Sequence, residues 1–279
     1  MPLRNEDRVV KILFVGDVVG RPGRDAVSAT VPLLIGHYQI DFTVINGENA
    51  AAGYGLTVKT ADELLAAGAN VLTSGNHIWS AKEAPALLDS HSNILRPANF
   101  PPDNPGHGSG VYEARNGAGV GVISLIGRTF MAPADCPFRR GDEELEKIRA
   151  HADVVLIDFH AEATSEKLSL AYYFDGRVAA VLGTHTHVMT CDEQVLPGGT
   201  AYLTDVGMTG PVGTVLGVQK EIAMRRFLSA MPERFEVPKH GEAILSAVVV
   251  DVSLDNGHAK DIQRLSLRVT DEGPDLTKL

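Results

Sequence analysis

Five apolar segments of this chain each run directly into a polar turn, and this pattern limits the possible folds more than any other feature. The segments lie at residues 9–17, 41–49, 69–77, 152–162 and 177–187. Their apolar residues are nearly continuous rather than alternating, which is typical of strands buried on both faces of a sheet. Helical patterns and Gly-rich turns separate several of them, so the sequence predicts an α/β fold.

The first third of the chain is interpreted as a βαβαβ unit. The apolar spacing predicts one helix over 21–38 and a second over 57–68. Thr57 or Thr60 can cap the second helix, because a threonine hydroxyl accepts a hydrogen bond from a free amide of the first turn. A short helix is expected from Ser80.

The remaining two thirds mix further strands with long loops. Strands are predicted at 119–127 and 200–207, and two long strands over 242–269 surround an Asp-Asn-Gly turn, which is a strong hairpin signal. Loops rich in Pro and Gly occupy 96–110 and 131–140, and the segment after the second loop is helical. This mixture favours an α/β sandwich with more than one sheet over a single doubly wound sheet.

Composition and charge exclude some classes of function. The 279 residues carry a formal charge of -10 with a pI near 5.4, which argues against a protein that holds nucleic acid by neutralising phosphates. Cys136 and Cys191 have no metal-binding spacing and suit a reducing compartment better than a disulfide framework. No segment approaches the roughly 20 apolar residues that cross a bilayer, and the N-terminus lacks a signal-peptide pattern. We expect a cytoplasmic protein with one domain over 1–279 and no membrane association.

Potential ligand side chains follow the predicted strands at the point where each strand ends. They are Asp17, Glu48, Asn49, Asn76, His77, His160, His185 and His187. Because the carboxyl ends of strands in an α/β sheet form the ligand-binding edge, these side chains are expected to meet. In an extended chain His185 and His187 would also point the same way. Imidazole, carboxylate and amide donors without a thiolate suit Mn, Fe, Zn or Co.

Each of these residues, taken singly, has an ordinary structural explanation. Asp17 can cap a helix, and Asn49 and Asn76 suit turns with a left-handed backbone. A lone His77 or His160 is more often a hydrogen-bonded polar residue than a ligand. However, five strand ends of one chain each carry a potential ligand, and this coincidence favours a shared site.

The residues around these positions resemble a known family. The motifs GDVVG, NGEN, SGNH, DFHAE and GTHTH are similar to the metal-binding motifs of the calcineurin-like metallophosphoesterases. The resemblance is closer to their bacterial branch of YmdB-type 2',3'-cyclic-nucleotide phosphodiesterases, since INGENAAAGYGLT, RPANFP, HAEATSEK and AYLTDVGMTGP also look like that branch. It spans residues 9–270 and implies two mixed β-sheets flanked by helices in α-β-β-α layers.

The chain departs from the wider superfamily at its first two motifs. The usual first motif is Asp-x-His, but Val19 stands two residues after Asp17 and cannot bind a metal. The usual bridging Asp is replaced by Glu48, and Asn49 can supply the oxygen that replaces the missing imidazole. The YmdB-type branch has this arrangement, so the departure supports the narrower resemblance.

The resemblance implies a centre of two metal ions, with iron, manganese or both expected and zinc not excluded. One ion would be held by Asp17, Glu48, Asn49 and His187. The other would be held by Glu48, Asn76, His160 and His185, with Glu48 as the shared bridge. The loops at 96–110, 128–140 and 204–211 either shape a pocket over this centre or are surface connections.

The activity that the resemblance implies is hydrolysis of a small cyclic nucleotide such as 2',3'-cAMP. A metal-bridging hydroxide would attack the phosphate, and His77 would protonate the leaving oxygen as general acid. The alternatives are a hydrolase of 3',5'-cyclic nucleotides or other small phosphoesters, and a regulatory protein that senses nucleotides with little turnover. A nuclease is disfavoured by the acidic composition. A homo-oligomer is the default expectation for the assembly.

Overall fold

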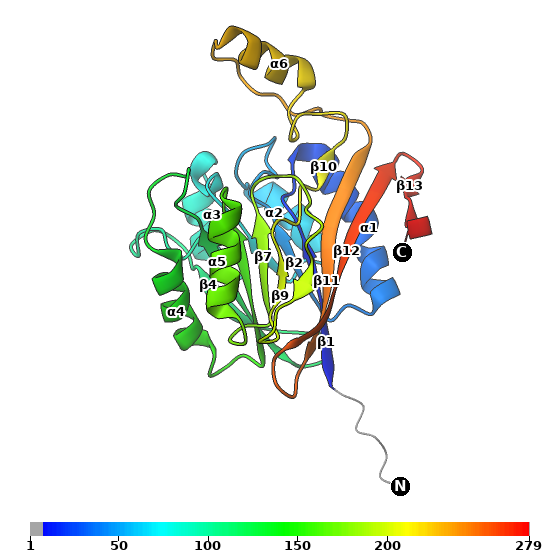
Figure 1. The fold of residues 1–279 in the computed structure, drawn as a ribbon. Coiled ribbons are helices and arrows are strands. Elements are labelled where there is room, and N and C mark those ends of the chain that lie inside the picture. Colours follow the sequence, from blue (N-terminus) through cyan, green and yellow to red (C-terminus); the bar gives the residue numbers. More distant parts are fainter. Residues whose placement is uncertain (1–7, 279) are drawn as a thin grey trace.

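The computed structural model describes residues 8–278 as two packed β-sheets with helices on their outer faces (Figure 1). In the first sheet, β1 pairs in parallel with β2 and antiparallel with β11. Its strands run in the order β13 (Gly273–Pro274), β12 (Ala259–Thr270), β11 (Ala243–Ser253), β1 (Val9–Val15), β2 (Phe42–Asn46) and β3 (Val71–Thr73), with β10 (Gly210–Pro211) on β11.

The second sheet is also mixed. Four parallel neighbours, β5, β6, β7 and β9, form its middle, and an antiparallel strand closes each edge. The order is β4 (Ser109–Glu113), β5 (Gly119–Ile126), β6 (Val154–His160), β7 (Ala180–Thr184), β9 (Ala201–Leu203) and β8 (Gln194–Val195). The apolar segments β2, β6 and β7 are buried along their whole length, as their continuous hydrophobicity predicts.

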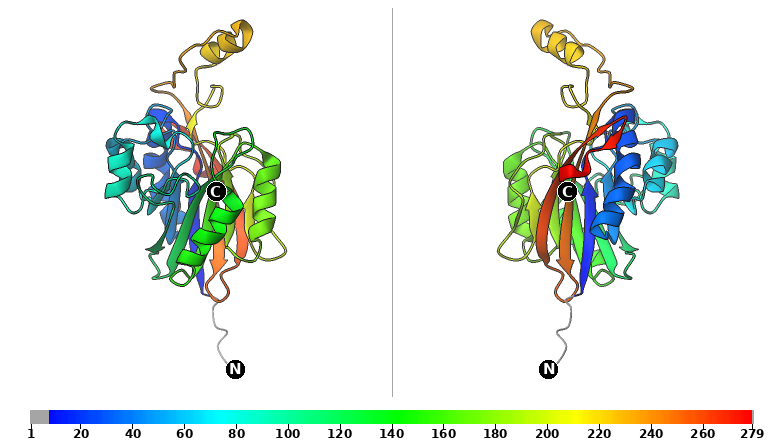
Figure 2. Two further views of the ribbon diagram at one scale, coloured as in Figure 1. Left: turned by 90° about the vertical axis from the view of Figure 1, so that its left-hand side faces the viewer. Right: turned by 90° about the vertical axis from the view of Figure 1, so that its right-hand side faces the viewer.

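Helices cover the outer face of each sheet (Figure 2). One apolar core lies between the two sheets, and another lies between each sheet and the helices that cover it. The first sheet carries α1 (Gly20–Tyr38), α2 (Val58–Ala66) and α3 (Ala84–Ser90), and the second carries α4 (Pro137–Ile148) and α5 (Thr164–Phe174). Short 3-10 helices occur at Ile78–Ser80 and Leu276–Lys278. The predicted α-β-β-α layers are therefore confirmed.

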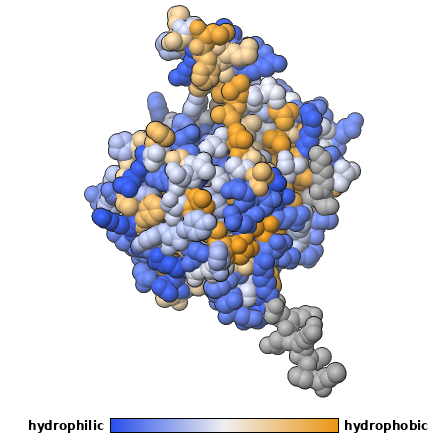
Figure 3. All heavy atoms as spheres, viewed as in Figure 1, coloured by the Kyte–Doolittle hydropathy of each residue, from blue (hydrophilic) through white to orange (hydrophobic). Residues whose placement is uncertain are grey.

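A sixth helix, α6 (Lys220–Ser229), stands away from the layered body in all three ribbon views. It belongs to residues 212–239, which leave the sheet after β10 and return to β11; we call them the capping segment. Figure 3 shows hydrophobic side chains gathered on this projection. Among residues 8–278, no helix combines the length and apolar character needed to cross a membrane.

Most predicted elements are present, with corrections at their ends. Thr57 caps α2, and its hydroxyl accepts from the Thr60 amide at 3.2 Å. The helix expected from Ser80 starts later, because Ile78–Ser80 forms a separate 3-10 turn and α3 begins at Ala84. The loop expected over 131–140 ends at 136, since Pro137 suits the first position of α4. The single-domain prediction for 1–279 extends at both ends beyond the described residues.

Candidate metal centre

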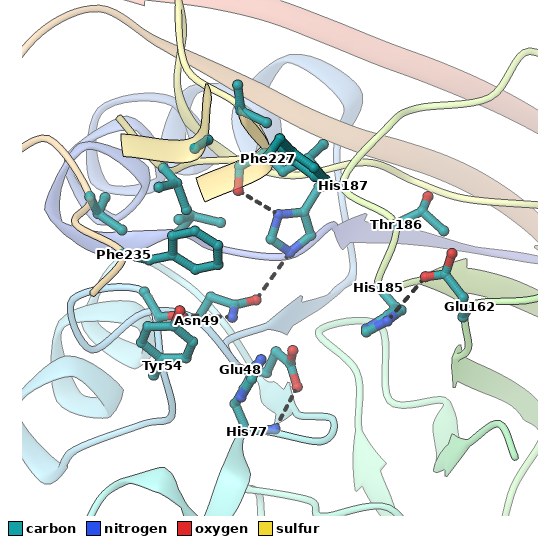
Figure 4. A pocket seen from close by; sticks show the side chains of 17 residues that line it. Glu48, Asn49, Tyr54, His77, Glu162, His185, Thr186, His187, Phe227 and Phe235 are labelled. Atoms are coloured by element: carbon teal, nitrogen blue, oxygen red, sulfur yellow. Dashed lines mark hydrogen bonds and ion pairs between the residues drawn. The ribbon is translucent and has the colours of Figure 1, made fainter. Parts of the chain in front are cut away.

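The strand ends of both sheets converge on one cavity of about 380 Å³ (Figure 4). Glu48 follows β2, His77 follows β3, and His185 follows β7, so three separate loops deliver side chains to its floor. The predicted residues that line the cavity are Glu48, Asn49, His77, His185 and His187. The arrangement agrees with the rule that α/β proteins collect ligands at the carboxyl ends of strands.

Glu48, His160 and His185 form the tightest part of the centre. Their potential ligand atoms all lie within 4.8 Å of one another. His160 Nε2 is 3.1 Å from Glu48 Oε1 and 3.0 Å from His185 Nδ1. The same nitrogen is 3.0 Å from Asn76 Oδ1. The four residues that the resemblance assigns to one ion are thus in direct contact around His160.

His187 and Asn49 form the neighbouring part, with His187 Nε2 3.3 Å from Asn49 Oδ1. The expectation that an extended chain aligns His185 and His187 is wrong. β7 ends at Thr184, and both histidines have left-handed backbones with φ of 100° and 65°. Non-glycine residues in this region carry strain, which surrounding contacts must hold in place. A tight turn, rather than strand alternation, brings both rings to the cavity.

Asp17 supplies an independent sign that a cation fits here. Its side chain is completely buried, and its Oδ2 accepts a hydrogen bond from the His185 amide at 3.1 Å. Its Oδ1 is buried without a hydrogen-bond partner, 3.6 Å from His160 Nδ1. Burial raises the pKa of this carboxyl. A buried carboxylate oxygen is costly when unpaired, and a bound cation would satisfy it.

A buried network behind His160 sets which of its nitrogens faces the centre. Thr184 Oγ1 donates to Asp158 at 2.8 Å, so it can only accept from His160 Nδ1, which lies 2.9 Å away. Asn46 also donates to Asp158, at 2.8 Å. In neutral His160 the proton therefore resides on Nδ1, and the Nε2 lone pair points toward Glu48. Such outer hydrogen bonds are the usual means of orienting a metal-binding imidazole.

Charge interactions in the centre strongly shift the ionisation of its groups. Burial opposes ionisation of Glu48, but His160 holds the pKa of Glu48 at about 2. Burial likewise opposes a charge on His160, yet Glu48 raises the pKa of His160 to about 9. Burial, together with His160, lowers the pKa of His185 to about 3. The protein without metal therefore holds one ion pair, Glu48 with His160, beside a neutral His185.

Glu162, within the DFHAE motif, is a site residue whose role the sequence alone does not indicate. Its Oε2 lies 3.3 Å from His185 Nε2 and its side chain is about half exposed, at 48%. Because a carboxylate only accepts hydrogen bonds, it places the proton of neutral His185 on Nε2 and leaves Nδ1 free toward the centre. The sequence signal for Glu162 was its place two residues after His160, a histidine at the end of a strand.

His77 lies at the edge of the centre rather than within it. Its backbone amide donates to Glu48 Oε2 at 3.2 Å, and its ring packs edge-on against Tyr54 with centroids 4.9 Å apart. Burial lowers the pKa of this imidazole, although Glu48 opposes the shift. The ring lines the cavity, so it can meet a bound ligand (Figure 4).

A glycine makes room for the tightest contacts. A Cβ on Gly75 would overlap both Glu48 Oε2 and the ring of His160. The residue before Asn76 therefore has no space for a side chain, which explains why the SGNH turn carries glycine at this position.

The outer wall of the cavity comes from the capping segment, which the sequence reasoning did not connect with the site. Of the loops proposed to shape the pocket, 96–110, 128–140 and 204–211 contribute no lining residue, and most of 204–211 is buried beneath the site, where Asp205 accepts a hydrogen bond from the Thr186 amide at 3.0 Å. The capping segment contributes Val215, Leu216, Val218, Ala223, Phe227, Phe235 and Val237. Its composition is ordinary, and no local motif marks it.

Comparisons with known proteins agree with this architecture. The family model described as YmdB-like protein matches residues 13–265. The chain is 50% identical over 256 residues to the 2',3'-cyclic-nucleotide 2'-phosphodiesterase of Bacillus subtilis, covering 92% of this chain and 96% of that protein. The structure of a protein from Mycoplasma pneumoniae described as a novel phosphatase aligns with a TM-score of 0.88 at 35% identity, covering 95% of each chain. A hypothetical protein from Thermus thermophilus aligns with a TM-score of 0.86 at 41% identity, covering 93% of this chain and 99% of that one.

Proposed function

The chain belongs to the YmdB-like protein family, and from this premise we propose that it is a metal-dependent phosphodiesterase acting on 2',3'-cyclic nucleotides. The observation that carries the proposal is the cluster of Glu48, His160 and His185, of which Glu48 and His185 line a cavity large enough for a small molecule. The name of the Bacillus subtilis relative supports this substrate class.

The donor set suits two divalent ions. We propose that Asp17, Glu48, Asn49 and His187 hold one ion and that Glu48, Asn76, His160 and His185 hold the other. The chemistry that such a pair supplies when bound is a nucleophile from water near neutral pH and positive charge for the phosphate. Iron or manganese is our proposal for their identity, and the nitrogen and oxygen donors also suit zinc.

The charges of the proposed centre then favour an anionic substrate, such as a phosphodiester. Asp17 and Glu48 are the two carboxylates of the proposed ligand set, fewer than the four positive charges of two divalent ions. The loaded centre would therefore attract an anion. His185 and His187 line the cavity and add no negative charge to it.

We propose that His77 holds the proton that is delivered to the leaving oxygen. Its ring lines the cavity, and the edge contact with Tyr54 restricts its rotation. Its backbone amide, rather than its ring, contacts Glu48. This leaves the ring nitrogens available to a substrate.

A substrate panel tests the function. The metal-loaded protein should hydrolyse 2',3'-cyclic nucleotides faster than 3',5'-cyclic nucleotides and phosphomonoesters, and chromatography of the products separates 2'-phosphate from 3'-phosphate. Preference for a 3',5'-cyclic nucleotide would reassign the substrate. Tight nucleotide binding with no turnover by fully metal-loaded protein would make the chain a sensor instead.

The remaining proposals rest on the sequence. The unpaired cysteines favour a cytoplasmic location, which cell fractionation tests. A homo-oligomer is proposed as the commonest state of soluble proteins, and one domain is proposed over 1–279. Sedimentation equilibrium would reject the homo-oligomer if the mass were that of one 29.8 kDa chain.

A further inference from the structure

The capping segment is held in a defined position over the centre. Its outgoing and returning limbs are joined where the Gln219 amide donates to the Glu236 carbonyl at 2.9 Å. A two-pronged ion pair between Arg225 and Glu233 closes the far end, with Nη2 to Oε2 at 2.8 Å. The segment is therefore a closed loop with internal bonds rather than a free tail.

Val237 fixes the returning limb to the body. Its side chain lies against Gly20 and Gly53, where an added Cβ would fall 2.7 Å and 2.6 Å from the valine methyl groups. Both glycines have positive φ, which disfavours any residue with a side chain, and neither position has room for a Cβ beside Val237. The two glycines therefore form a notch that the Val237 side chain fills. This contact restrains the position of Phe235, which lies two residues earlier and lines the cavity.

The cavity has two chemically different sides. Its floor carries Glu48, His77, His185 and His187, whereas every residue that the capping segment contributes is apolar. A ligand that matches both sides has an anionic group at one end and a flat or apolar group at the other. A nucleoside phosphate has this form.

Phe235 is the aromatic side chain best placed to meet the apolar end. Its ring is only partly exposed, and Figure 4 shows it in the cavity beside Asn49 and Tyr54. The Arg226 guanidinium lies over the ring, 4.5 Å from its centroid. This cation–π contact restrains the ring, which also contributes to the lining of the cavity.

We infer that the apolar wall is the nucleobase subsite and that Phe235 stacks on the base. The inference rests on the proposed function, because a phosphate on the metal centre places the base at this wall. Stacking uses the π face that every base has. The wall has no side-chain hydrogen-bond donor or acceptor, so adenine, guanine, cytosine and uracil 2',3'-cyclic nucleotides should all be accepted, within about tenfold.

The test compares a substrate with a base and one without. Phe235→Leu should lower kcat/KM for 2',3'-cAMP by roughly 5- to 150-fold, the usual effect of losing one base–aromatic stack. The loss should appear mainly in KM. Hydrolysis of ribose 2',3'-cyclic phosphate should change less than about twofold, because it has no base to stack.

Two matched variants complete the experiment. Phe235→Tyr keeps the ring and should restore the native selectivity. Phe130→Leu removes a phenyl group that is 89% exposed and does not line the cavity, so neither substrate should be affected. Calorimetry provides a readout without turnover: adenosine 3'-phosphate should bind the native protein more tightly than ribose 3-phosphate, and Phe235→Leu should remove most of that difference.

The inference and the proposed function fail in different ways. Equal losses on both substrates in Phe235→Leu, or a native protein whose affinity does not depend on the base, would overturn the subsite. A metal-loaded native protein that binds both ligands with the expected difference but hydrolyses neither cyclic phosphate would overturn the enzyme and support the subsite.

Discussion

His160 Nε2 lies 3.1 Å from Glu48 Oε1, and both side chains are withdrawn from solvent. The two residues come from different sheets, since Glu48 follows β2 and His160 ends β6. The contact therefore joins the two halves of the sandwich at the floor of the cavity. Any change that removes one member leaves the other as a buried group without its partner.

Glu48→Gln is expected to lose most bound metal, because the proposed bridge serves both ions and an amide oxygen is a weaker donor. Elemental analysis of protein purified without chelator should give close to two ions per native chain and well below one in the variant. Turnover should fall at least 10- to 100-fold, the range for disturbed metal sites. Glu113→Gln, an exposed carboxylate on β4, is the matched control. Normal metal content and turnover in Glu48→Gln would remove this residue from the centre.

Metal binding should strengthen as pH rises. Without metal, the pKa of His160 is raised to about 9, so the imidazole is protonated at neutral pH and must lose this proton to become a ligand. Below pH 9 each unit of pH should raise the affinity about tenfold for one released proton. Calorimetric titration of chelator-treated protein with Mn²⁺, in buffers of different ionisation enthalpy, measures the proton release. Affinity that is flat between pH 6.5 and 8.5 would contradict the assignment.

Because the pKa of His160 is raised, the metal-free fold becomes less stable as pH rises, whereas metal binding becomes stronger. A His160 pKa above its ordinary value of 6.5 contributes stability that is present below pH 6.5 and lost as pH rises toward 9. The denaturation midpoint of chelator-treated protein should accordingly fall across this range, whereas metal-loaded protein should not show this loss.

His77→Ala is expected to keep both metals but slow hydrolysis of a 2',3'-cyclic nucleotide by roughly 10²- to 10⁴-fold. The ribose leaving oxygen is strongly basic and needs a proton, whereas nitrophenolate leaves without one. Activity on a nitrophenyl phosphodiester should therefore fall much less. Equal losses on both substrates would assign His77 to phosphate binding, and loss of a metal would make it a ligand.

Glu162 gives a prediction that separates orientation from charge. Glu162→Ala removes the acceptor that holds His185 Nε2–H and should weaken metal binding or turnover about 10- to 100-fold. Glu162→Gln retains an oxygen acceptor and should stay within a few-fold of native. Glu146→Ala, an exposed carboxylate on α4, controls for lost surface charge. If the Gln and Ala variants were equally impaired, the charge of Glu162 rather than its hydrogen bond would matter.

Patterns that are local along the chain predict an α/β sandwich with more than one sheet and bring the candidate residues to one edge, whereas the α-β-β-α layers were implied by the family resemblance. A continuous apolar segment identifies a buried strand, and its end places Glu48 or His160 at the sheet edge. The same reasoning failed for His185 and His187, whose directions depend on a strained turn that no periodicity reveals. It also missed α5, which has a weakly periodic pattern between two clear strands.

The apolar wall could not be predicted for a different reason. Phe235 lines the cavity next to a contact that Val237 makes with Gly20 and Gly53, residues far away in the sequence. Such a fit is a property of the assembled surfaces. Glu162 illustrates the intermediate case: it lies inside a recognised motif, but its role becomes visible only with the position of His185.

The capping segment enters and leaves the body at neighbouring points, since the Val212 amide donates to the Glu242 carbonyl at 3.0 Å beside the β10–β11 pair. It can consequently be lengthened, shortened or exchanged without altering the register of any strand that carries a candidate ligand. On the proposed roles, the residues that carry the reaction and those that select the ligand lie on separate stretches of chain, joined where His187 Nδ1 lies 3.1 Å from the Leu216 carbonyl oxygen. Transplanting residues 212–239 between relatives with the same strand-end residues is therefore expected to change ligand choice, and to preserve the reaction only where this contact to His187 is kept.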